Sequence, residues 1–421
     1  MTTTVAVFTR DLRVRDNPML AGAVRGAEHV VPLFVRDDRV TAASAIRTRV
    51  LDAALSDLDT SLRGLGGRLV VRNGDPVTEI SRVAADVSAA RVHIAADVSS
   101  YAQAREKALR SALSCQLVVH DDVHTVVPPG ALTPPGKDHF AVFSAYHRRW
   151  ADHEWRRPVS TPKRLSLPRI RAGTVPPAKG GETAGRARMT SWLRNSAKSY
   201  ADTRDLLAVD GTSRLSPYLH LGCVSALELA RRAEERSPEF VRQLAWRDFH
   251  HQVLAARPDA AHEDYWSRGD RWLDDDHALA AWCAGETGIP IVDAGMRQLL
   301  AEGWMHNRAR MIVASFLTKT LYLDWRAGAA HFAKHLLDGD VANNSLNWQW
   351  VAGTGTDTRP NRVLNPLRQA ERFDPDGEYV RRHVPELSTV DDVRRPPATR
   401  GYPPPIVDLA EGRARFLAAR G

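Results

Sequence analysis

The sequence predicts an N-terminal α/β domain with a parallel, Rossmann-like sheet, followed by an all-α C-terminal domain. Three observations lead to this prediction. Short apolar runs alternate with helical patterns before residue 126, prolines cluster over 126–195, and the apolar spacing is helical almost throughout from residue 196. A chain of 421 residues is longer than one compact core usually holds, so more than one domain is expected.

Five apolar runs predict the strands of the sheet, at 5–8, 29–35, 68–72, 91–96 and 116–120. Between the second and third runs, one helical face is apolar: Val50, Leu51, Ala54, Leu55, Leu58 and Leu62. Strands that alternate with helices predict βαβ units and a parallel sheet. TRDLRVRD follows the first strand in place of the phosphate fingerprint GxGxxG, so the sheet is not expected to hold a dinucleotide in the usual way.

The predicted domain boundaries follow the changes in composition. The α/β domain covers 1–130, a connector covers 131–195, and the helical domain covers 196–421. The connector is rich in proline and basic residues, with a helix expected around FSAYHRRWADHEW. Nine of the eleven tryptophans lie from Trp192 onward, where packing in a helical core is the simplest explanation for them.

The composition bears on whether the protein has a nucleic-acid partner, a membrane span, a disulfide framework or a zinc site. The net charge of +8 and the pI of about 9.6 fit a nucleic-acid partner, but they fit a basic protein without one equally well. No apolar run approaches the length of a membrane span, and the N-terminus reads as a strand rather than a signal peptide. The three cysteines are far apart, which indicates neither a disulfide framework nor a zinc site. A cytoplasmic protein without a metal is expected.

The segment FVRQLAWRDFHHQV places four polar or aromatic side chains on one helical face: Gln243, Trp246, Arg247 and His250. An amide, an indole, a guanidinium and an imidazole are not typical of a helical face that packs in a hydrophobic core. A partly exposed polar face would explain them, and so would a planar ligand that stacks or hydrogen-bonds there.

Two further segments repeat this pattern. WMHNRARM aligns Asn307, Arg310 and Met311, and DGDVANN brings two carboxylates beside a glycine. A helical domain would bury Arg310 only if it were paired, and Asp338 or Asp340 is the expected partner.

Two short stretches complete the candidate site. DGTSRLSPYLHLG (210–222) opens a helix with hydroxyls and free amides, which can cradle an anion or simply cap the helix. NWQWVAGTG (347–355) places Trp348 and Trp350 two residues apart. On a helix such residues are separated by about 200°, so the two indoles are expected to have different surroundings.

Taken together, these segments resemble the DNA photolyases and cryptochromes. The matching stretches are TSRLSPYLHLG, LAWRDF, GIPIVDAGMRQL, GWMHNRARM, LDWR, DGDVANN and NWQW, with weaker likeness from VFTRDLRVRDNPML to YPPPIVDLA. Each motif alone is weak, whereas their order and spacing are highly specific. The likeness covers essentially the whole chain and is greatest to microbial class I cyclobutane-pyrimidine-dimer photolyases.

The resemblance implies an antenna-chromophore domain, a connector and a helical FAD-binding domain. The residues implied to bind FAD are Tyr200, Thr212, Ser213, Arg214, Leu215, Ser216, Gln243, Arg247, Asn307, Arg310, Asp338, Gly339, Asp340 and Asn344. Among them, Arg310 would pair with Asp338 beside the isoalloxazine, and the Asn344 amide would face flavin N5.

The resemblance also assigns the two indoles of NWQW. Trp348 would face the flavin and Trp350 would line the cavity that receives the lesion, together with Gln243, Trp246, Asn307 and Met311. Electrons would reach the flavin along Trp272, Trp325 and Trp348, with Trp282 as packing.

The implied activity is that of a deoxyribodipyrimidine photo-lyase, a carbon–carbon lyase. Excited, reduced FAD would give an electron to a flipped-out dimer in UV-damaged DNA, and neither a metal nor a nucleophile is needed. A monomer is expected. A blue-light-sensing cryptochrome or a (6-4) photolyase with the same fold and cofactor remains the alternative, although the short tail after YPPPIVDLA is unlike that of many cryptochromes.

Two departures from the family pattern bear on the substrate. Gln243 stands where dimer photolyases commonly have glutamate, and glutamine there is more typical of (6-4) photolyases and animal cryptochromes. WMHNRARM, however, lacks the paired histidines of the animal (6-4) enzymes, which favours dimer repair. The stretch TRPNRVLNP (358–366) also departs from the usual aromatic-containing form.

The antenna follows from the residues after the fourth strand. Tyr101 and Ala102 replace the Asn-Glu pair of folate-binding relatives, and Asp97 resembles the acidic residue of deazaflavin-type relatives. An 8-hydroxydeazaflavin is therefore favoured over methenyltetrahydrofolate, with an empty pocket as the alternative.

Overall fold

The computed structural model describes residues 2–37, 45–396, 398 and 401–420. The chain divides into two compact units. The first, called the sheet unit, comprises Met1–Lys198 and Ser213–Asp259. The second, called the helical unit, comprises Ser199–Thr212 and Ala260–Gly421.

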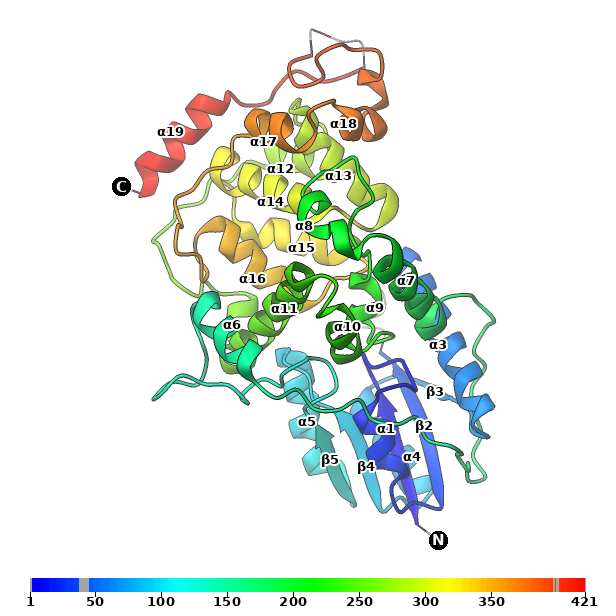
Figure 1. Ribbon diagram of the computed structural model, residues 1–421. Helices are drawn as coiled ribbons and strands as arrows, with labels where there is room; N and C mark the ends of the chain where they lie inside the picture. Colours follow the sequence, from blue (N-terminus) through cyan, green and yellow to red (C-terminus); the bar gives the residue numbers. More distant parts are fainter. Residues whose placement is uncertain (1, 38–44, 397, 399–400, 421) are drawn as a thin grey trace. The chain divides into compact units, whose positions relative to one another are not determined.

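The sheet unit is built on five parallel strands in the order β3-β2-β1-β4-β5 (Figure 1). All five predicted strands are present: β1 (Thr3–Phe8), β2 (His29–Arg36), β3 (Val70–Asn73), β4 (Arg91–Ala95) and β5 (Gln116–His120). The chain runs from β1 outward to β3, and then returns to place β4 on the other side of β1. The carboxyl ends of β1 and β4 therefore form the switch point at which open α/β sheets bind ligands.

Helices cover both faces of this sheet, because alternate strand residues point to opposite sides. On one face, α1 (Pro18–Val24) and α3 (Ala45–Gly64) pack against Ala6, Phe8 and Phe34. On the other face, α4 (Pro76–Asp86) and α5 (Ser100–Ala112) pack against Val5, Val7 and Ile94. The predicted apolar face of α3 is the buried one, since Ala54, Leu55, Leu58 and Leu62 all lie in this core.

Further helical segments of the described residues belong to the sheet unit. They are α6 (Phe143–Asp152), α7 (Gly181–Asn195), η1 (Ala197–Ser199), α9 (Ser216–His220), α10 (Ala226–Ala233) and α11 (Pro238–Ala256). The helix expected around FSAYHRRWADHEW is therefore confirmed as α6, whereas α7 was not anticipated within the proline-rich stretch. A short 3-10 turn, η2 (Pro258–Ala261), follows α11.

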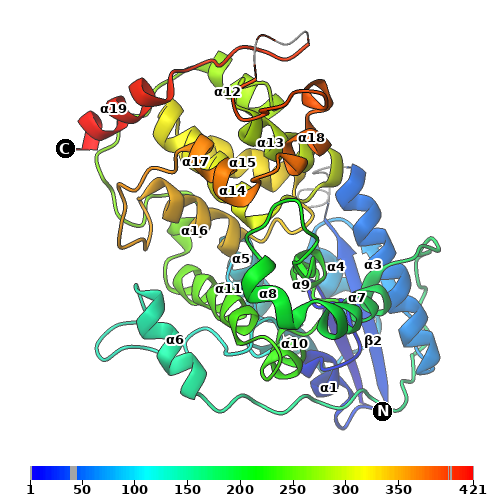
Figure 2. The same cartoon turned by 45° about the horizontal axis from the view of Figure 1, so that its top comes forward.

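Among its described residues, the helical unit packs around a core of buried side chains that includes Trp282, Trp325 and Trp348. α15 and α16 lie side by side in both views (Figures 1 and 2). Its elements are α8 (Tyr200–Thr203), α12 (Asp276–Ala284), α13 (Pro290–Glu302), α14 (Asn307–Ser315), η3 (Phe316–Leu321), α15 (Trp325–His335), α16 (Val341–Ala352), α17 (Pro366–Phe373), α18 (Glu378–His383), η4 (Pro385–Leu387) and α19 (Leu409–Arg420).

Two breaks shape the long helical stretch after Pro290. The first is at Gly303, which ends α13 with φ +62, a left-handed conformation that glycine adopts without strain. The break at Gly303 separates α13 from α14. The second was not predicted: η3 is π-helical and ends at Tyr322, which is also left-handed with φ +59. Within the described part of the chain, no helix is long and apolar enough to cross a membrane.

Candidate functional site

The two indoles of NWQW lie on α16 and have different surroundings, as predicted. Trp348 is buried, with 2% of its surface exposed, whereas Trp350 is half-buried. The guanidinium of Arg362 lies 5.2 Å from the centre of the Trp350 ring, within cation–π distance. One indole thus belongs to the core and the other to a partly open surface.

The Trp348 indole is held by close packing. A Cβ added to Gly328 on α15 would lie 2.2 Å from its Cη2 atom, so only glycine leaves room for the ring. The rings of Phe332 and Trp282 contact it edge-on, with centroid separations of 5.0 and 5.9 Å. The Trp282 indole N–H donates to the Val313 carbonyl at 3.0 Å. These contacts are consistent with the packing role expected for Trp282.

Gln349, between the two indoles, is a structural anchor that the sequence did not reveal. Its side chain is fully buried, and its Oε1 accepts from the Tyr265 N–H at 2.7 Å. Its Nε2 donates to the carbonyls of Ala260 and Glu263, at 2.7 and 2.9 Å. The amide therefore binds the segment 260–265 to α16.

The other two tryptophans of the predicted chain also lie in the helical unit. Trp325, the first residue of α15, is fully buried, and its indole N–H donates to Asp264 at 2.8 Å. Trp272 is half-buried. Trp272 is therefore more exposed to solvent than Trp348 and Trp325. An electron-transfer route from the core to the surface would require such an order.

Arg310 and Asp338 form the ion pair that the sequence predicted. The Arg310 Nη2 donates to Asp338 Oδ2 at 2.9 Å, and its Nε donates to the Met305 carbonyl at 2.9 Å. The Asp338 side chain is 5% exposed. A buried carboxylate that accepts a guanidinium N–H satisfies the condition for burying either charge.

Asp340 begins α16. Its carboxylate accepts from the backbone N–H and from the side-chain amide of Asn343, at 2.9 and 2.8 Å, which caps the helix. Gly339 lies directly before it. Asp340 therefore has a structural role as the N-cap of α16.

Asn344 presents an amide with an open acceptor. Its Nδ2 donates to the Ala329 carbonyl at 2.9 Å, and the side chain is half-buried. No residue in the described part of the chain donates to its Oδ1. This oxygen can therefore accept from a ligand N–H.

α14 carries the remaining predicted residues of the helical unit. Asn307 is its first residue and is exposed, while Met311 is half-buried one turn later. His306 caps this helix, since its Nδ1 accepts from the Arg308 N–H at 3.1 Å. The His306 side chain is 2% exposed, so a structural role explains it.

α11 in the sheet unit carries the four side chains that were predicted to share one helical face. Gln243, Trp246 and Arg247 are half-buried, and His250 is buried. The Trp246 indole stacks flat on Phe143 of α6, with ring centroids 3.7 Å apart and an interplanar angle of 8°. Phe143 was not among the residues expected at the site. Its place in an aromatic-rich segment was the only signal.

Arg247 and the neighbouring Asp248 bind α11 to residues 124–127, which follow β5, and to Trp150 of α6. The Arg247 guanidinium donates to the His124 carbonyl at 2.6 Å. The buried Asp248 carboxylate accepts from the N–H groups of Val126 and Val127 and from the Trp150 indole, at 2.9 to 3.0 Å. Burial raises the pKa of Asp248. In LAWRDF the aspartate is therefore structural.

The predicted phosphate-binding segment is divided between the two units. Tyr200, buried at the start of α8, and Thr212 belong to the helical unit. Ser213, Arg214, Leu215 and Ser216 belong to the sheet unit. Arg214 has φ +50, an uncommon conformation for a residue with a side chain, and Ser213 Oγ accepts from the Leu215 N–H at 3.3 Å.

The carboxyl edge of the sheet holds a second group of charged residues. The Arg10 guanidinium donates to both carboxylate oxygens of Asp97, at 2.7 and 2.8 Å. These two residues follow β1 and β4, at the switch point. Beside β2, the Asp37 carboxylate accepts from the Tyr101 hydroxyl. In the described part of the chain, no group of three or more His, Cys, Asp and Glu side chains could hold a metal ion.

The chain is similar to known proteins both in its sequence and in its structure. Residues 4–163 match the family described as DNA photolyase, and residues 240–420 match the FAD binding domain of DNA photolyase. A Streptomyces griseus protein named deoxyribodipyrimidine photo-lyase is 54% identical over 100% of both chains. Two solved structures are also similar. One is a class III photolyase from Agrobacterium tumefaciens, with 32% identity and a TM-score of 0.90 over 99% of this chain and 96% of that one. The other is a Synechocystis cryptochrome, with 28% identity and a TM-score of 0.91 over 99% of both chains. This chain therefore belongs to the DNA photolyase and cryptochrome family.

Proposed function

We propose that this protein is a deoxyribodipyrimidine photo-lyase, which uses light and FAD to split cyclobutane pyrimidine dimers in UV-damaged DNA. The arrangement of α16 carries the proposal, because one helix offers a buried indole at Trp348 and a half-buried indole at Trp350. Full-length identity of 54% to a protein of that name supports it. We expect a monomer in the cytoplasm.

The residues present fit FAD in their chemistry. Asn344 offers a carbonyl oxygen that no described residue uses, and Arg310 is held by Asp338 so that its charge is already balanced. The proposed FAD-binding residues are Tyr200, Thr212, Ser213, Arg214, Leu215, Ser216, Gln243, Arg247, Asn307, Arg310, Asp338, Gly339, Asp340 and Asn344. When bound and reduced, FAD would absorb blue light and supply the electron for dimer splitting.

The chain's own residues would then position the substrate. Trp246 and Trp350 would stack on the extruded dimer, with Asn307 and Met311 nearby, while the Gln243 amide would hydrogen-bond the pyrimidine edges. Trp246 suits this role because Phe143 already fixes its ring plane by stacking. Trp272, Trp325 and Trp348 would conduct electrons that restore the reduced cofactor.

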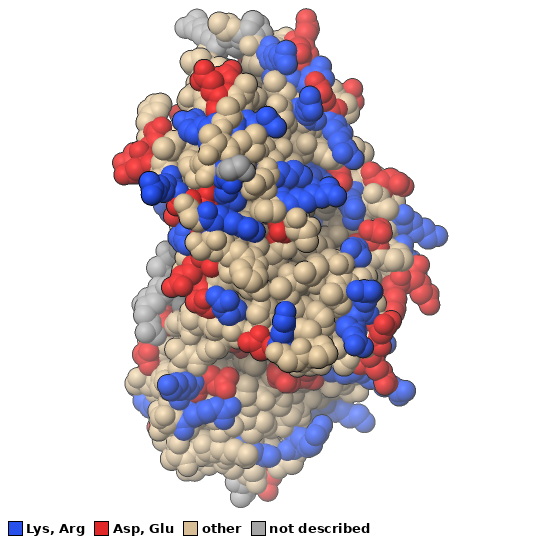
Figure 3. Space-filling view, turned by 90° about the vertical axis from the view of Figure 1, so that its left-hand side faces the viewer, with Lys and Arg blue, Asp and Glu red and all other residues tan. Residues whose placement is uncertain are grey.

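Damaged DNA would bind through basic side chains as well as through stacking. The protein carries 58 Lys and Arg against 50 Asp and Glu. Figure 3 shows Lys and Arg side chains spread over the face that it presents, with acidic side chains among them. Binding should therefore weaken as salt rises, because phosphate contacts release counterions.

For the three segments of the chain we propose an antenna region (1–130), a connector (131–195) and an FAD-binding region (196–421). The antenna would bind at the carboxyl edge of the sheet, where Arg10 and Asp97 lie at the switch point. We favour 8-hydroxydeazaflavin over methenyltetrahydrofolate, with an empty pocket as the alternative. Energy transfer to FAD after addition of each chromophore, and its loss in Asp97→Ala, would distinguish the three cases.

The experiment that tests this proposal measures light-dependent dimer repair. Purified protein with chemically reduced FAD is illuminated with blue light in the presence of dimer-containing DNA, and restored thymines are counted. A dark sample and a sample with oxidised FAD serve as controls. Light-dependent restoration is expected. Its absence with FAD bound and reduced would contradict the proposal.

A blue-light-sensing cryptochrome is the second candidate, supported by the structural likeness to the Synechocystis protein. The same experiment separates the two functions. A sensor would photoreduce its flavin without restoring thymines, whereas a photo-lyase would do both.

A further inference from the structure

Two aromatic rings and one guanidinium join α6 to α11. The two helices lie side by side in both ribbon views (Figures 1 and 2). The Phe143 ring of α6 lies flat on the Trp246 indole of α11, with ring centroids 3.7 Å apart. The guanidinium carbon of Arg242 lies 4.9 Å from the centre of the same Phe143 ring, within cation–π distance. Arg242 and Trp246 are four residues apart on α11, so both side chains lie on the side of the helix that faces α6.

Phe143 covers one face of the Trp246 indole and leaves the other for a ligand. Phe143 is 6% exposed, and the fully buried Phe249 contacts both rings edge-on, at 5.7 Å from Phe143 and 5.6 Å from Trp246. The plane of the indole is therefore fixed from one side. Trp246 itself is half-buried, so an extruded pyrimidine can stack only on the face that Phe143 does not cover.

Arg242 has a hydrogen-bond partner on α6, but this partner carries no negative charge. The Arg242 Nη1 donates to His147 Nδ1 at 3.3 Å, which requires that this ring nitrogen carries no proton. Burial, together with the Arg242 charge, lowers the pKa of His147, so the neutral ring prevails at neutral pH. Among the described residues, no carboxylate forms an ion pair with Arg242, whereas Arg310 is paired with Asp338. Arg242 is half-buried, so its guanidinium is held in place and still reached by solvent.

We propose that Arg242 binds a phosphate of the DNA strand beside the extruded dimer, and that Phe143 holds this guanidinium and the Trp246 ring in place. The inference rests on the proposed function, because it needs a dimer stacked on Trp246. Each nucleotide of an extruded pair carries its own phosphate, which therefore comes close to the indole on which the base stacks. A guanidinium suits this phosphate, since it can donate two parallel N–H groups to two oxygens while another N–H stays bonded to His147.

A purely structural role is the alternative for Arg242, which would then only fasten α6 to α11. Lysine distinguishes the two roles. Its ammonium group neutralises a phosphate as a point charge, but it lacks the planar, multiply donating group that contacts both Phe143 and His147. Arg242→Lys should therefore keep a phosphate contact and lose a purely structural one.

The test measures the binding of dimer-containing and undamaged duplexes by the FAD-loaded protein, in the dark and over a series of salt concentrations. In Arg242→Gln one phosphate contact is lost, so the plot of log K against log salt concentration should become shallower by about 0.9 for dimer DNA. The slope for undamaged DNA should not change, because no pyrimidine is extruded from it toward Trp246. Arg242→Lys should keep the parent slope on both DNAs.

Arg110→Gln is the matched control, because it removes the same charge from an exposed residue of α5 that pairs with Glu106. Both of its slopes should equal those of the parent. Phe143→Leu tests the positioning role. It should weaken the binding of dimer DNA by about two- to tenfold, the usual contribution of an aromatic pair, and leave the binding of undamaged DNA and the flavin absorbance spectrum unchanged. Urea titrations verify that each variant is folded under the binding conditions.

The outcomes separate this inference from the proposed function. Unchanged slopes in Arg242→Gln would overturn the phosphate contact, and an equal change on both DNAs would overturn its link to the extruded dimer. An Arg242→Lys slope equal to that of Arg242→Gln would leave only the structural role, and a Phe143→Leu variant that binds dimer DNA like the parent would overturn the positioning role. Dimer repair by the chemically reduced parent is measured in parallel. A parent that neither prefers dimer DNA nor repairs it would contradict the proposed function, and this inference with it.

Discussion

Gly328 lies directly against the Trp348 indole, so closely that a methyl group in its place would be 2.2 Å from the ring. Overpacking a core typically costs about 1–3 kcal/mol, and we expect Gly328→Ala to lower the free energy of unfolding by that amount. Denaturant titration measures the change. Gly64→Ala is the control, because a Cβ at Gly64 meets no atom within 4 Å. An unchanged stability in Gly328→Ala would mean that the indole moves freely.

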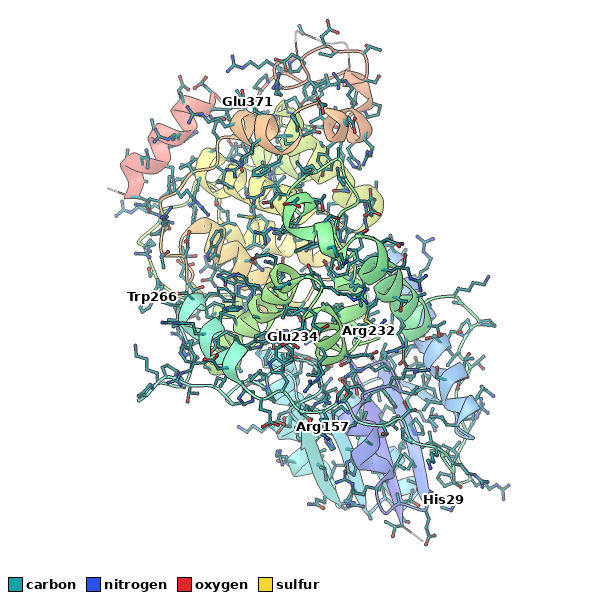
Figure 4. The ribbon with its side chains drawn as sticks, viewed as in Figure 1. His29, Arg157, Arg232, Glu234, Trp266 and Glu371 are labelled. Carbon is teal, nitrogen blue, oxygen red and sulfur yellow. The ribbon has the colours of Figure 1, made fainter. Side chains whose placement is uncertain are left out.

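Trp348 is also the expected first donor to the photoexcited oxidised flavin. Trp348→Phe should slow photoreduction strongly in the presence of an external donor, followed as bleaching of the oxidised flavin absorbance. Trp266→Phe provides the comparison, since Trp266 (labelled in Figure 4) is 53% exposed and outside the proposed chain. If both variants photoreduce like the parent, electrons do not pass through Trp348.

Trp350 should matter for damaged DNA in particular. Trp350→Ala is expected to weaken binding to dimer-containing DNA by about 1–3 kcal/mol, the usual loss for one base–aromatic stack. Binding to undamaged DNA should change little, because phosphate contacts dominate it. Titrations of both DNAs at two salt concentrations test this. Equal losses for both DNAs would remove Trp350 from the lesion cavity.

Lys319 should make stability depend on pH. It is buried, its Nζ donates to the Pro360 and Arg362 carbonyls at 2.7 and 2.9 Å, and burial lowers its pKa from 10.5 to about 7. From pH 7 to 10.5 the unfolded chain then holds the proton more often than the folded one, so this residue's contribution to stability rises with pH, by at most about 1.4 kcal/mol per pH unit.

In Lys319→Met this rise should disappear, so the stability of the parent relative to the variant should increase as pH increases. Urea titrations across this range measure it. The matched substitution Lys107→Met, at an exposed residue of α5, should leave the pH dependence unchanged. A parent and a Lys319→Met variant with parallel pH profiles would contradict the lowered pKa.

Gln243 and His306 decide the lesion type, because Gln243 would hydrogen-bond the lesion, and repair of a (6-4) lesion needs a proton transfer for which His306 is the nearest candidate in the sequence. If the substrate is the dimer, Gln243→Glu should be tolerated, because a charge-assisted hydrogen bond offsets the desolvation of the new carboxylate. His306→Asn should then keep dimer repair, since asparagine also caps helices well, and His306→Leu should lose about 1 kcal/mol of stability. Repair of (6-4) lesions that vanishes in His306→Asn, with a pH dependence in the histidine range, would reverse the choice of substrate.

The sequence was most informative where the signal is local. Apolar runs such as VAVF and QLVVH lie on strands, and Gly303 ends its helix as a left-handed glycine should. The Arg310–Asp338 pair could also be predicted, because a buried guanidinium needs a carboxylate and only two were close in the motif pattern.

Long-range contacts were beyond sequence reasoning. Gln349 anchors groups 84 to 89 residues away, which no periodicity reveals. The π-helical turn of η3 and the left-handed Tyr322 depend on tertiary contacts, since neither FLTKTL nor a tyrosine favours such geometry. Phe143 became a candidate only when its ring was found stacked on Trp246.

The hydrogen bonds between α11 and residues 126–140 have a consequence for where this chain can be cut. Asp248 holds the N–H groups of Val126 and Val127, and Gln252 bonds both the N–H and the carbonyl of Phe140 at 2.9 Å. Amides in this stretch should exchange with deuterium about as slowly as those of α11 itself. Residues 171–179 are mostly exposed and lack regular structure, so proteases should nick the chain there first. New termini for a circular permutant should therefore be placed within residues 171–179 and not within 126–140, although both stretches have the proline-rich composition of a linker.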